Sequence, residues 1–311
     1  MRYRRIAALL IALLCIAGAV FSQQALRQAR IPSDVEIIRD VEFGKGGDVS
    51  LKLDIVRPKT QPKERMPVVV FIHGGGWQKG DKASAVGKLI PLAQKGYFCA
   101  TINYRLTDVA PFPAQIEDCK CAIRWVRARA KEYNADPDHI GVWGGSAGGH
   151  LVALLGTSGG IKPLEGKGGW AKFSSKVQAV ADYFGPTDFL YWAEEVKKSG
   201  LSIEELQKQR ANGAISKLFG GPFTEKLDVA KQASPVTYIT KGDPPVFIGH
   251  GENDLLVPLS QSQVFYDALK AKGIEATLHI VKGQGHGFRD PETDQMVADF
   301  FDKHLRHAKA K

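Results

Sequence analysis

Residues 140–155 read IGVWGGSAGGHLVALL, and this stretch decides the fold class. The apolar run Ile140 to Trp143 predicts a short buried strand, and Ala147 to about Leu155 predicts a helix. The segment between them, Gly144-Gly145-Ser146-Ala147-Gly148, is long enough only for a sharp bend. A strand that turns directly into a helix is the repeating unit of a parallel sheet covered by helices.

The bend carries the G-x-S-x-G pattern of a nucleophile elbow, in which a strained strand-to-helix turn presents a serine hydroxyl above the sheet. Small neighbours permit the unusual backbone, and the helix directs free N–H groups at the same point. We therefore predict Ser146 as a nucleophile. The alternative interpretation is an ordinary glycine-rich turn that contains a serine.

Strands and helices alternate on both sides of this bend. The pattern predicts strands at 35–43, 49–56, 68–72, 97–102, 140–143, 177–183, 246–249 and 276–281, with helices at 83–95, 113–133, 147–155, 260–272 and 291–304. Such alternation indicates an α/β fold with a mostly parallel central sheet and helices on both faces. The first two strands, joined by a glycine turn, are expected to pair antiparallel. Residues 185–238 interrupt the rhythm and are predicted to form a small cap-like insertion.

A glycine-rich loop, His73-Gly74-Gly75-Gly76-Trp77, follows the predicted strand at 68–72. Consecutive glycines let the backbone approach a substrate and turn two N–H groups toward one point, which an oxyanion requires. We predict that Gly74, Gly75 and Ala147 form an oxyanion hole, and that His73 shapes the loop. A phosphate-binding turn is the alternative, but neither a lysine nor a helix start lies where a phosphate needs it. Trp77 is a candidate substrate-binding residue, and core packing is its alternative role.

A base and an acid are expected after the serine, in the chain order Ser, Asp or Glu, His. His286 lies just beyond the strand 276–281, and Asp254 lies just beyond the strand 246–249. Because the carboxyl ends of parallel strands meet at one edge of a sheet, we predict that Ser146, Asp254 and His286 form a catalytic triad. His250 follows its strand too closely to be the base, and His150 is expected to pack or cap. Asp182 and Asp188 are alternative acids for which pairing or turn formation is expected.

These motifs, together with Asn103-Tyr104-Arg105, resemble those of the α/β-hydrolase carboxylesterases. The likeness covers nearly the whole chain after residue 22. It is closest to the branch with acetyl-xylan and feruloyl esterases, and the chain is also similar to hormone-sensitive-lipase-like enzymes. The segment at Asp254 lacks the longer acidic motif typical of hormone-sensitive-lipase-like enzymes, which favours the acetyl/feruloyl branch.

The resemblance implies a serine carboxylesterase that hydrolyses short-chain acyl esters through an acyl-enzyme, without metal or organic cofactor. Acetyl or feruloyl groups on plant polysaccharide are the expected substrates. Three alternatives remain: an arylformamidase-like enzyme, a peptidase-like serine hydrolase, and a non-catalytic binding protein of hydrolase fold. The last class usually lacks a triad member, whereas this chain keeps all three in order.

The beginning of the chain predicts export. Arg2, Arg4 and Arg5 precede an apolar run from Ile6 to Val20, the pattern of a signal peptide over residues 1–22. A catalytic domain over 23–311 is then expected to be secreted or periplasmic, with no stable membrane insertion after cleavage. An uncleaved anchor is the alternative.

Charge and cysteine content narrow the possible partners. The formal net charge of the 311 residues is +9, but no basic stripe interleaved with aromatic residues is present, so a nucleic-acid partner is not expected. An ester or acylated carbohydrate is the expected partner. Three cysteines follow the predicted signal, an odd number that predicts buried thiols rather than a disulfide framework.

Overall fold

The computed structural model describes residues 31–198, 200, 205 and 213–306. Its centre is an eight-stranded sheet in the order β1-β2-β4-β3-β5-β6-β7-β8. The strands are β1 (Val35–Gly46), β2 (Val49–Pro58), β3 (Met66–Ile72), β4 (Phe98–Ile102), β5 (Ala135–Gly145), β6 (Ala179–Tyr183), β7 (Val246–Gly251) and β8 (Ala276–Val281). Strand β2 pairs antiparallel with β1 and β4, and every other pair is parallel. The predicted fold class and the antiparallel first pair are confirmed.

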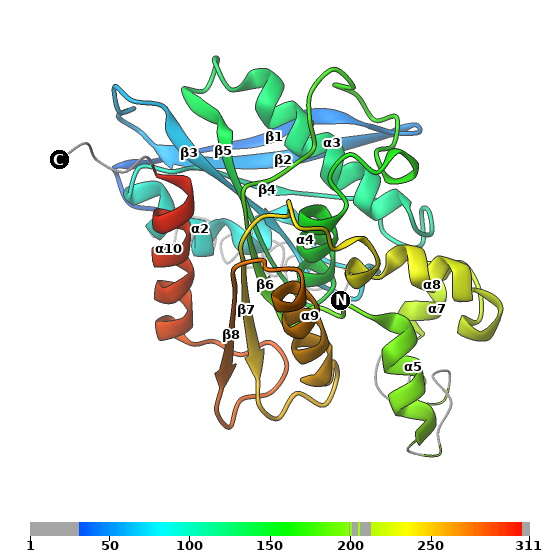
Figure 1. The fold of residues 1–311 in the computed structure, drawn as a ribbon. Helices are drawn as coiled ribbons and strands as arrows, with labels where there is room; N and C mark the ends of the chain where they lie inside the picture. The colour runs from blue at the N-terminus through cyan, green and yellow to red at the C-terminus, as the bar shows by residue number, and fades with distance from the viewer. Residues whose placement is uncertain (1–30, 199, 201–204, 206–212, 307–311) are drawn as a thin grey trace, which may run out of the picture.

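Helices cover both faces of the sheet (Figure 1). One face is covered by α3 (Ala114–Arg129), α4 (Ala147–Thr157) and α9 (Ser260–Ala271), and the other by α2 (Val86–Gln94) and α10 (Pro291–Leu305). Strand β3 shows why two layers are needed: Val68 and Val70 are buried in the core on the α4 side, whereas Val69 is buried in the core on the α10 side. A strand that is apolar on both faces is stable only between two layers of helices.

Strand β5 is longer than the sequence predicts, because it begins at Ala135 rather than Ile140. Asp136, Pro137 and Asp138 conceal this first part, since proline and aspartate are uncommon in strands. His139 consequently lies within the strand. The carboxyl end of the strand, where the candidate serine lies, is where the sequence places it.

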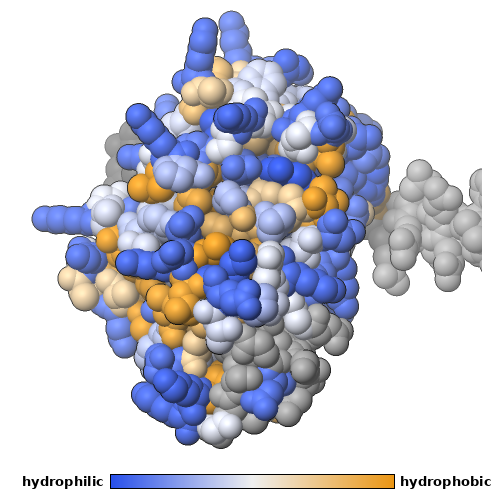
Figure 2. Space-filling model, turned by 90° about the vertical axis from the view of Figure 1, so that its right-hand side faces the viewer, coloured by the Kyte–Doolittle hydropathy of each residue, from blue (hydrophilic) through white to orange (hydrophobic). Residues whose placement is uncertain are grey.

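The insertion between β6 and β7 breaks the alternation as predicted. It contains α5 (Phe189–Lys198), α7 (Ala214–Phe219), α8 (Leu227–Ala233) and the 3-10 helices η3 (Phe223–Glu225) and η4 (Pro235–Tyr238). These short helices lie to the right of the sheet in Figure 1. The surface on this side is largely hydrophilic, with apolar residues gathered near the middle and lower left of the view in Figure 2.

Two further sequence predictions concern the cysteines and the beginning of the chain. Cys99, Cys119 and Cys121 are buried free thiols, which confirms the packing role. The predicted signal peptide, residues 1–22, lies outside the described residues. Within the part of the chain that the structure describes, none of the helices has both the length and the apolar composition needed to cross a membrane.

Candidate active site

Ser146 lies on the bend between β5 and α4, with φ 57° and ψ −123°. A non-glycine residue in this region is strained, and close packing of the neighbouring backbone holds it there. A Cβ on Gly148 would lie 2.1 Å from the carbonyl oxygen of Ile72 in β3, and a Cβ on Gly144 would lie 2.4 Å from the oxygen of Gly148. The backbone N–H of Ser146 donates to the carbonyl of Tyr183 in β6 at 2.8 Å. The bend is therefore clamped between both neighbouring strands.

The three predicted triad residues form a chain of hydrogen bonds with His286 in the middle. His286 Nε2 is 2.9 Å from Ser146 Oγ, and His286 Nδ1 is 2.7 Å from Asp254 Oδ2. Asp254 follows β7 and His286 follows β8, so the chain brings them 108 and 140 residues from the serine. With Nδ1 donating to the carboxylate, Nε2 is free to accept the serine proton.

Asp254 is held as a carboxylate by several donors. Its Oδ1 accepts from the backbone N–H groups of Leu256 at 2.8 Å and Val257 at 2.9 Å. Burial raises the pKa of Asp254, but hydrogen bonds from His250 and His286 and from Val257 outweigh it and hold the pKa well below its usual value. Asp254 is thus ionised at neutral pH and can accept the hydrogen bond that orients the His286 imidazole.

His250 is the site residue whose part the sequence did not predict. It lies inside β7 rather than after it, which corrects the expected position, and its ring is fully buried. Its Nδ1 accepts from Ser262 Oγ at 2.6 Å, and its Nε2 donates to the carbonyl of Val257 at 3.0 Å while lying 3.4 Å from Asp254 Oδ2. His250 therefore supports the turn that carries Asp254. Its four-residue spacing from Asp254 was the available signal.

The glycine loop packs directly against the bend. A Cβ on Gly74 would lie 2.7 Å from the carbonyl oxygen of Gly145 and 3.4 Å from the Cβ of Ser146. Gly75 has φ +116° and its carbonyl accepts from Gln78 and Lys79, which makes the loop a tight turn. Gly74 therefore lies against Ser146, and Ala147, the first residue of α4, follows the serine directly. Their function as oxyanion donors, with Gly75, stays a prediction.

His73 shapes this loop, as the sequence indicates. Its Nδ1 donates to the carbonyl of Gly74 at 2.8 Å, and its ring stacks on Tyr104 at a centroid distance of 4.4 Å. The Tyr104 hydroxyl donates to the carbonyl of His73 at 3.1 Å. Burial lowers the pKa of His73, so a neutral ring is the form that suits this position.

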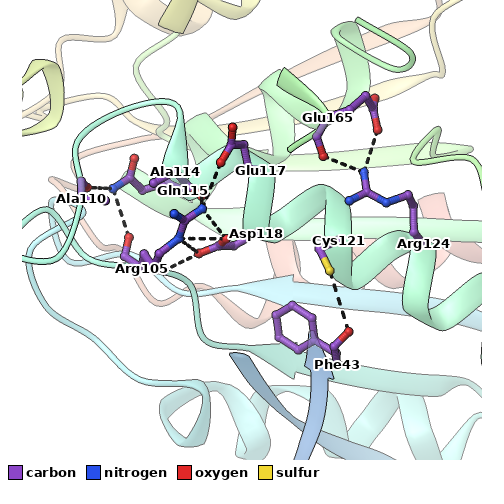
Figure 3. Close-up of polar contacts among 10 residues, drawn as sticks. All are labelled: Phe43, Arg105, Ala110, Ala114, Gln115, Glu117, Asp118, Cys121, Arg124 and Glu165. Carbon is purple, nitrogen blue, oxygen red and sulfur yellow. Dashed lines mark hydrogen bonds and ion pairs between the residues drawn. The ribbon is translucent and has the colours of Figure 1, made fainter. Parts of the chain in front are cut away.

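Arg105 anchors the Asn103-Tyr104-Arg105 motif to α3. Its guanidinium contacts both oxygens of Asp118 and also Glu117 (Figure 3). The approach is close enough that a Cβ on Gly46 would lie 2.3 Å from Arg105 Nε. The motif therefore connects α3, through Arg105, with the glycine loop, through Tyr104.

Trp77 is 4% exposed and belongs to the apolar core, yet part of it reaches the pocket wall. Its predicted contact with substrate stays a prediction beside this packing role. The alternative acids have structural partners: Asp182 Oδ1 accepts from Gly185 N, and Asp188 Oδ1 accepts from the N–H groups of Leu190 and Tyr191.

A cavity of about 590 Å³ opens above Ser146 and reaches His286 and the glycine loop. Among the aromatic residues at the start of the insertion, Phe184 and Trp192 line it, whereas Phe189 is buried in the core and Tyr191 is exposed on α5. Phe184 also contacts the His286 ring edge-on at 4.8 Å. A serine hydroxyl, an imidazole and a carboxylate at the base of a mainly apolar pocket can carry out acyl transfer.

A protein-family model described as BD-FAE matches residues 53–269. The chain belongs to the BD-FAE family. The matched range holds the glycine loop, Ser146 and Asp254, and His286 lies beyond it.

Known proteins similar to this BD-FAE family member are esterases of the α/β-hydrolase fold. It is 35% identical over 236 residues to Esterase LipQ of Mycobacterium tuberculosis, with 75% of this chain and 53% of the relative covered. A solved structure titled as a truncated carbohydrate esterase from gut microbiota has a TM-score of 0.76 and 32% identity, with 86% of this chain and 95% of that chain covered. Butyrate-bound esterase 2 of Thermogutta terrifontis has a TM-score of 0.69 and 28% identity, with 87% and 94% covered.

The chain spans little more than half the length of the first curated relatives that it matches, between 53% and 58%. The family and the fold are shared over that part. The predicted recognition as an α/β-hydrolase of the esterase kind is confirmed.

Proposed function

We propose that this protein is a serine carboxylesterase that hydrolyses short-chain acyl esters through a covalent acyl-enzyme. One observation carries the proposal: Ser146 Oγ, His286 and Asp254 form a continuous hydrogen-bonded chain, with contacts of 2.9 Å and 2.7 Å, at the floor of the pocket. The esterase names of its relatives agree with it.

The first step is attack of Ser146 Oγ on the ester carbonyl carbon while His286 Nε2 takes the hydroxyl proton. The carbonyl oxygen becomes an oxyanion, which accepts hydrogen bonds from the backbone N–H groups of Gly74, Gly75 and Ala147. Asp254 keeps Nδ1 protonated and stabilises the imidazolium. Collapse of the tetrahedral intermediate breaks the bond to the alcohol oxygen, which receives the proton from Nε2. Water then repeats the sequence on the acyl-enzyme and frees Ser146.

The pocket favours small acyl groups. A cavity of about 590 Å³ must hold both the acyl and the alcohol parts of the substrate. Helix α5, which forms part of the insertion, carries Glu194, Glu195, Lys197 and Lys198, unlike the apolar lid that long acyl chains require. Acetyl or feruloyl groups on plant polysaccharide are the proposed natural substrates, supported by the likeness to a carbohydrate esterase. Export, predicted from residues 1–22, would bring the enzyme to such polymers.

A serine exchange tests the function directly. Ser146→Ala is expected to lower kcat for p-nitrophenyl acetate by at least about 10⁴-fold and to abolish fluorophosphonate labelling, because no nucleophile remains. Ser50→Ala, on the exposed β1–β2 hairpin, is the matched control. Circular dichroism checks that both variants fold. Normal turnover by Ser146→Ala would disprove the proposal.

The acyl and alcohol groups need a substrate panel. We expect kcat/KM to be highest for p-nitrophenyl esters from acetate to butyrate and to fall for octanoate, since the cavity of about 590 Å³ must hold the alcohol part as well as the acyl chain. Release of acetate from acetylated xylan, or of ferulate from a feruloyl ester, would show that the enzyme acts as the acetyl-xylan and feruloyl esterases do. Preference for octanoate over acetate would contradict the assignment.

A further inference from the structure

The walls of the pocket differ in chemistry on the two sides of Ser146. On the side covered by α4 and α9 the lining is apolar and comes from the insertion and the loop after β7: Pro186, Trp192, Ala214, Ile215, Leu256 and Val257. The cations of the lining lie elsewhere: Lys79 follows the glycine loop, Lys88 belongs to α2, and Arg289 precedes α10. We call this part of the lining the cationic side, although aromatic residues, among them Phe184 and Phe288, also belong to the pocket wall. The pocket therefore offers different surfaces to the two halves of an ester.

The cationic side has no carboxylate of its own. Lys79, Lys88 and Arg289 line the pocket, and neither an aspartate nor a glutamate is among its described lining residues. Lys88 is partly neutralised by Asp294, 3.2 Å away. Lys79 and Arg289 are exposed and form no ion pair with any residue that the structure describes. Two unpaired cations thus face the pocket.

Acidic groups do lie near this side, but backbone and side-chain donors engage them. Asp81 accepts from the N–H of Ala83 at the start of η1 (Lys82–Ala85), and Asp290 caps α10 by accepting from the N–H of Thr293. Neither lines the pocket. Among the described residues that line the pocket, the lysines and Arg289 are therefore the charged groups nearest to a bound substrate, and they favour an anion.

Both unpaired cations belong to loops that carry predicted catalytic groups: Lys79 lies beside the glycine loop, and Arg289 lies in the same loop as His286. The Cγ of Lys79 is 3.2 Å from the position of a Cβ on Gly75, so its side chain runs beside the predicted oxyanion loop. Arg289 is three residues beyond His286, and Phe288 between them packs on Tyr183 at 5.1 Å. The leaving alcohol receives its proton from His286, which places that half of the substrate near the loop that carries Arg289.

We propose that the enzyme selects esters whose alcohol part carries a carboxylate, as an acylated uronic-acid sugar does, and that Lys79 and Arg289 recognise this charge. The inference rests on the proposed esterase function. The apolar side receives the acyl group, and the cationic side receives the anionic alcohol. Opposite charges held in a cleft with apolar walls raise both the encounter rate and the affinity, and salt weakens both.

A matched pair of esters tests the proposal: 4-acetoxybenzoate, whose alcohol part is anionic, and its neutral methyl ester. The measured quantity is the ratio of kcat/KM for the anionic ester to that for the neutral ester. In the double variant Lys79→Gln/Arg289→Gln we expect this ratio to fall about tenfold relative to the wild type, because the different chemical reactivities of the two esters cancel. In the wild type, about 0.5 M NaCl should lower the same ratio.

Lys272→Gln is the control, because it removes one exposed cation at the end of α9, outside the pocket, and should leave the ratio unchanged. A ratio that the double variant does not change, or that Lys272→Gln lowers equally, would overturn the proposal. Affinity supplies a readout that does not depend on turnover. Titration calorimetry of Ser146→Ala should show tighter binding of 4-acetoxybenzoate than of its methyl ester, and the added double substitution should remove the difference.

The kinetic and the binding measurements together distinguish a failure of the esterase function from a failure of the charge selection. If the wild type hydrolyses neither ester, the esterase function is wrong, and the binding comparison still decides the charge selection. If both esters are hydrolysed but the double variant leaves both the ratio and the affinities as they were, the charge selection alone is wrong.

Discussion

The indole Nε1 of Trp77 donates a hydrogen bond to Nδ1 of His150 at 3.2 Å, with both side chains buried. Trp77 belongs to the glycine loop, and His150 lies one helical turn after Ser146 in α4. The other ring nitrogen of His150 donates to the carbonyl of Ala233 in the insertion at 2.7 Å. Burial lowers the pKa of His150 to about 4, which keeps the ring neutral and Nδ1 able to accept. One imidazole thus joins the glycine loop, the serine helix and the insertion.

Trp77→Phe tests this connection. The variant keeps an aromatic ring but leaves His150 Nδ1 without a donor, and a buried unsatisfied polar atom costs about 1–2 kcal/mol of unfolding free energy. Displacement of the glycine loop is expected to lower kcat/KM for p-nitrophenyl acetate about tenfold. Urea denaturation and initial rates measure the two effects.

Trp170→Phe is the matched control, because Trp170 also donates its indole N–H, to the carbonyl of Phe43, but does not line the pocket. It should leave kcat/KM unchanged and cost less stability than Trp77→Phe, because Trp170 is 37% exposed and water can replace part of the lost interaction. Unchanged kcat/KM in Trp77→Phe would show that the loop does not depend on the indole hydrogen bond.

The fold was predictable because most strands of the parallel part contain a short apolar run. Val68 to Ile72 is such a run, and the structure buries four of its five residues. The start of β5 was not predictable, because the composition of residues 136–139 opposes a strand, and the pairing of Ala135 with Met66 in β3 is separated by an irregularity from the regular pairing that resumes at Ile140. There, tertiary pairing overrides local preference.

The candidate site divides in the same way. Ser146, Asp254 and His286 follow strands in a fixed order, so topology alone predicts that they meet. The structural roles of His150 and His250 depend on hydrogen bonds to Ala233 and to Ser262, respectively. Packing between segments that are distant in the sequence brings these partners together. Sequence spacing carries no information about the contacts with Ala233 and Ser262, whereas the four-residue spacing of His250 from Asp254 does indicate that these two residues lie close together.

Gly148→Ala is expected to disrupt the bend. The added Cβ would lie 2.1 Å from the backbone oxygen of Ile72, which cannot move without displacing β3. Core strain of this kind costs about 1–3 kcal/mol, and movement of Ser146 should remove most of the esterase activity. Thermal unfolding and p-nitrophenyl acetate turnover provide the measurements.

Gly87→Ala is the control for this exchange. Gly87 is exposed within α2, and a Cβ there meets nothing within 4 Å. Alanine should therefore stabilise the protein by about 0.5–1 kcal/mol and leave turnover unchanged. Gly148→Ala with normal stability and activity would mean that the close packing at the bend is not required.

Asp254→Asn is expected to lower kcat about 10³–10⁴-fold, because an amide does not hold His286 in the required tautomer. Because the pKa of Asp254 lies below its usual value, the carboxylate is already ionised throughout the assay range, and the loss should be similar from about pH 6 to pH 9. Asp188→Asn removes only the carboxylate that caps α5 and should keep normal kcat. If Asp188→Asn caused the larger loss, the assignment of the acid would be wrong.

Asp182 gives a pH-dependent stability. It is fully buried in β6, its Oδ1 accepts from the N–H of Gly185 at 3.0 Å, and its Oδ2 has no hydrogen-bond partner. Burial raises its pKa to about 7. Because the folded-state pKa exceeds the unfolded value, the folded protein binds more protons than the unfolded chain between about pH 4 and pH 7, and stability falls as pH rises through that window.

Asp182→Asn removes this dependence, because the amide matches the protonated acid in shape and cannot ionise. The unfolding free energy of the variant minus that of the wild type should therefore rise from about pH 4 to pH 8 by a few kcal/mol, at most about 4. Urea denaturation at each pH measures the difference, so other titrating groups, His150 included, cancel. Asp267→Asn, which removes an exposed carboxylate on α9, should give a flat difference. A flat difference for Asp182→Asn as well would show that Asp182 does not ionise in this window, because only a buried carboxyl that loses its proton there produces the slope.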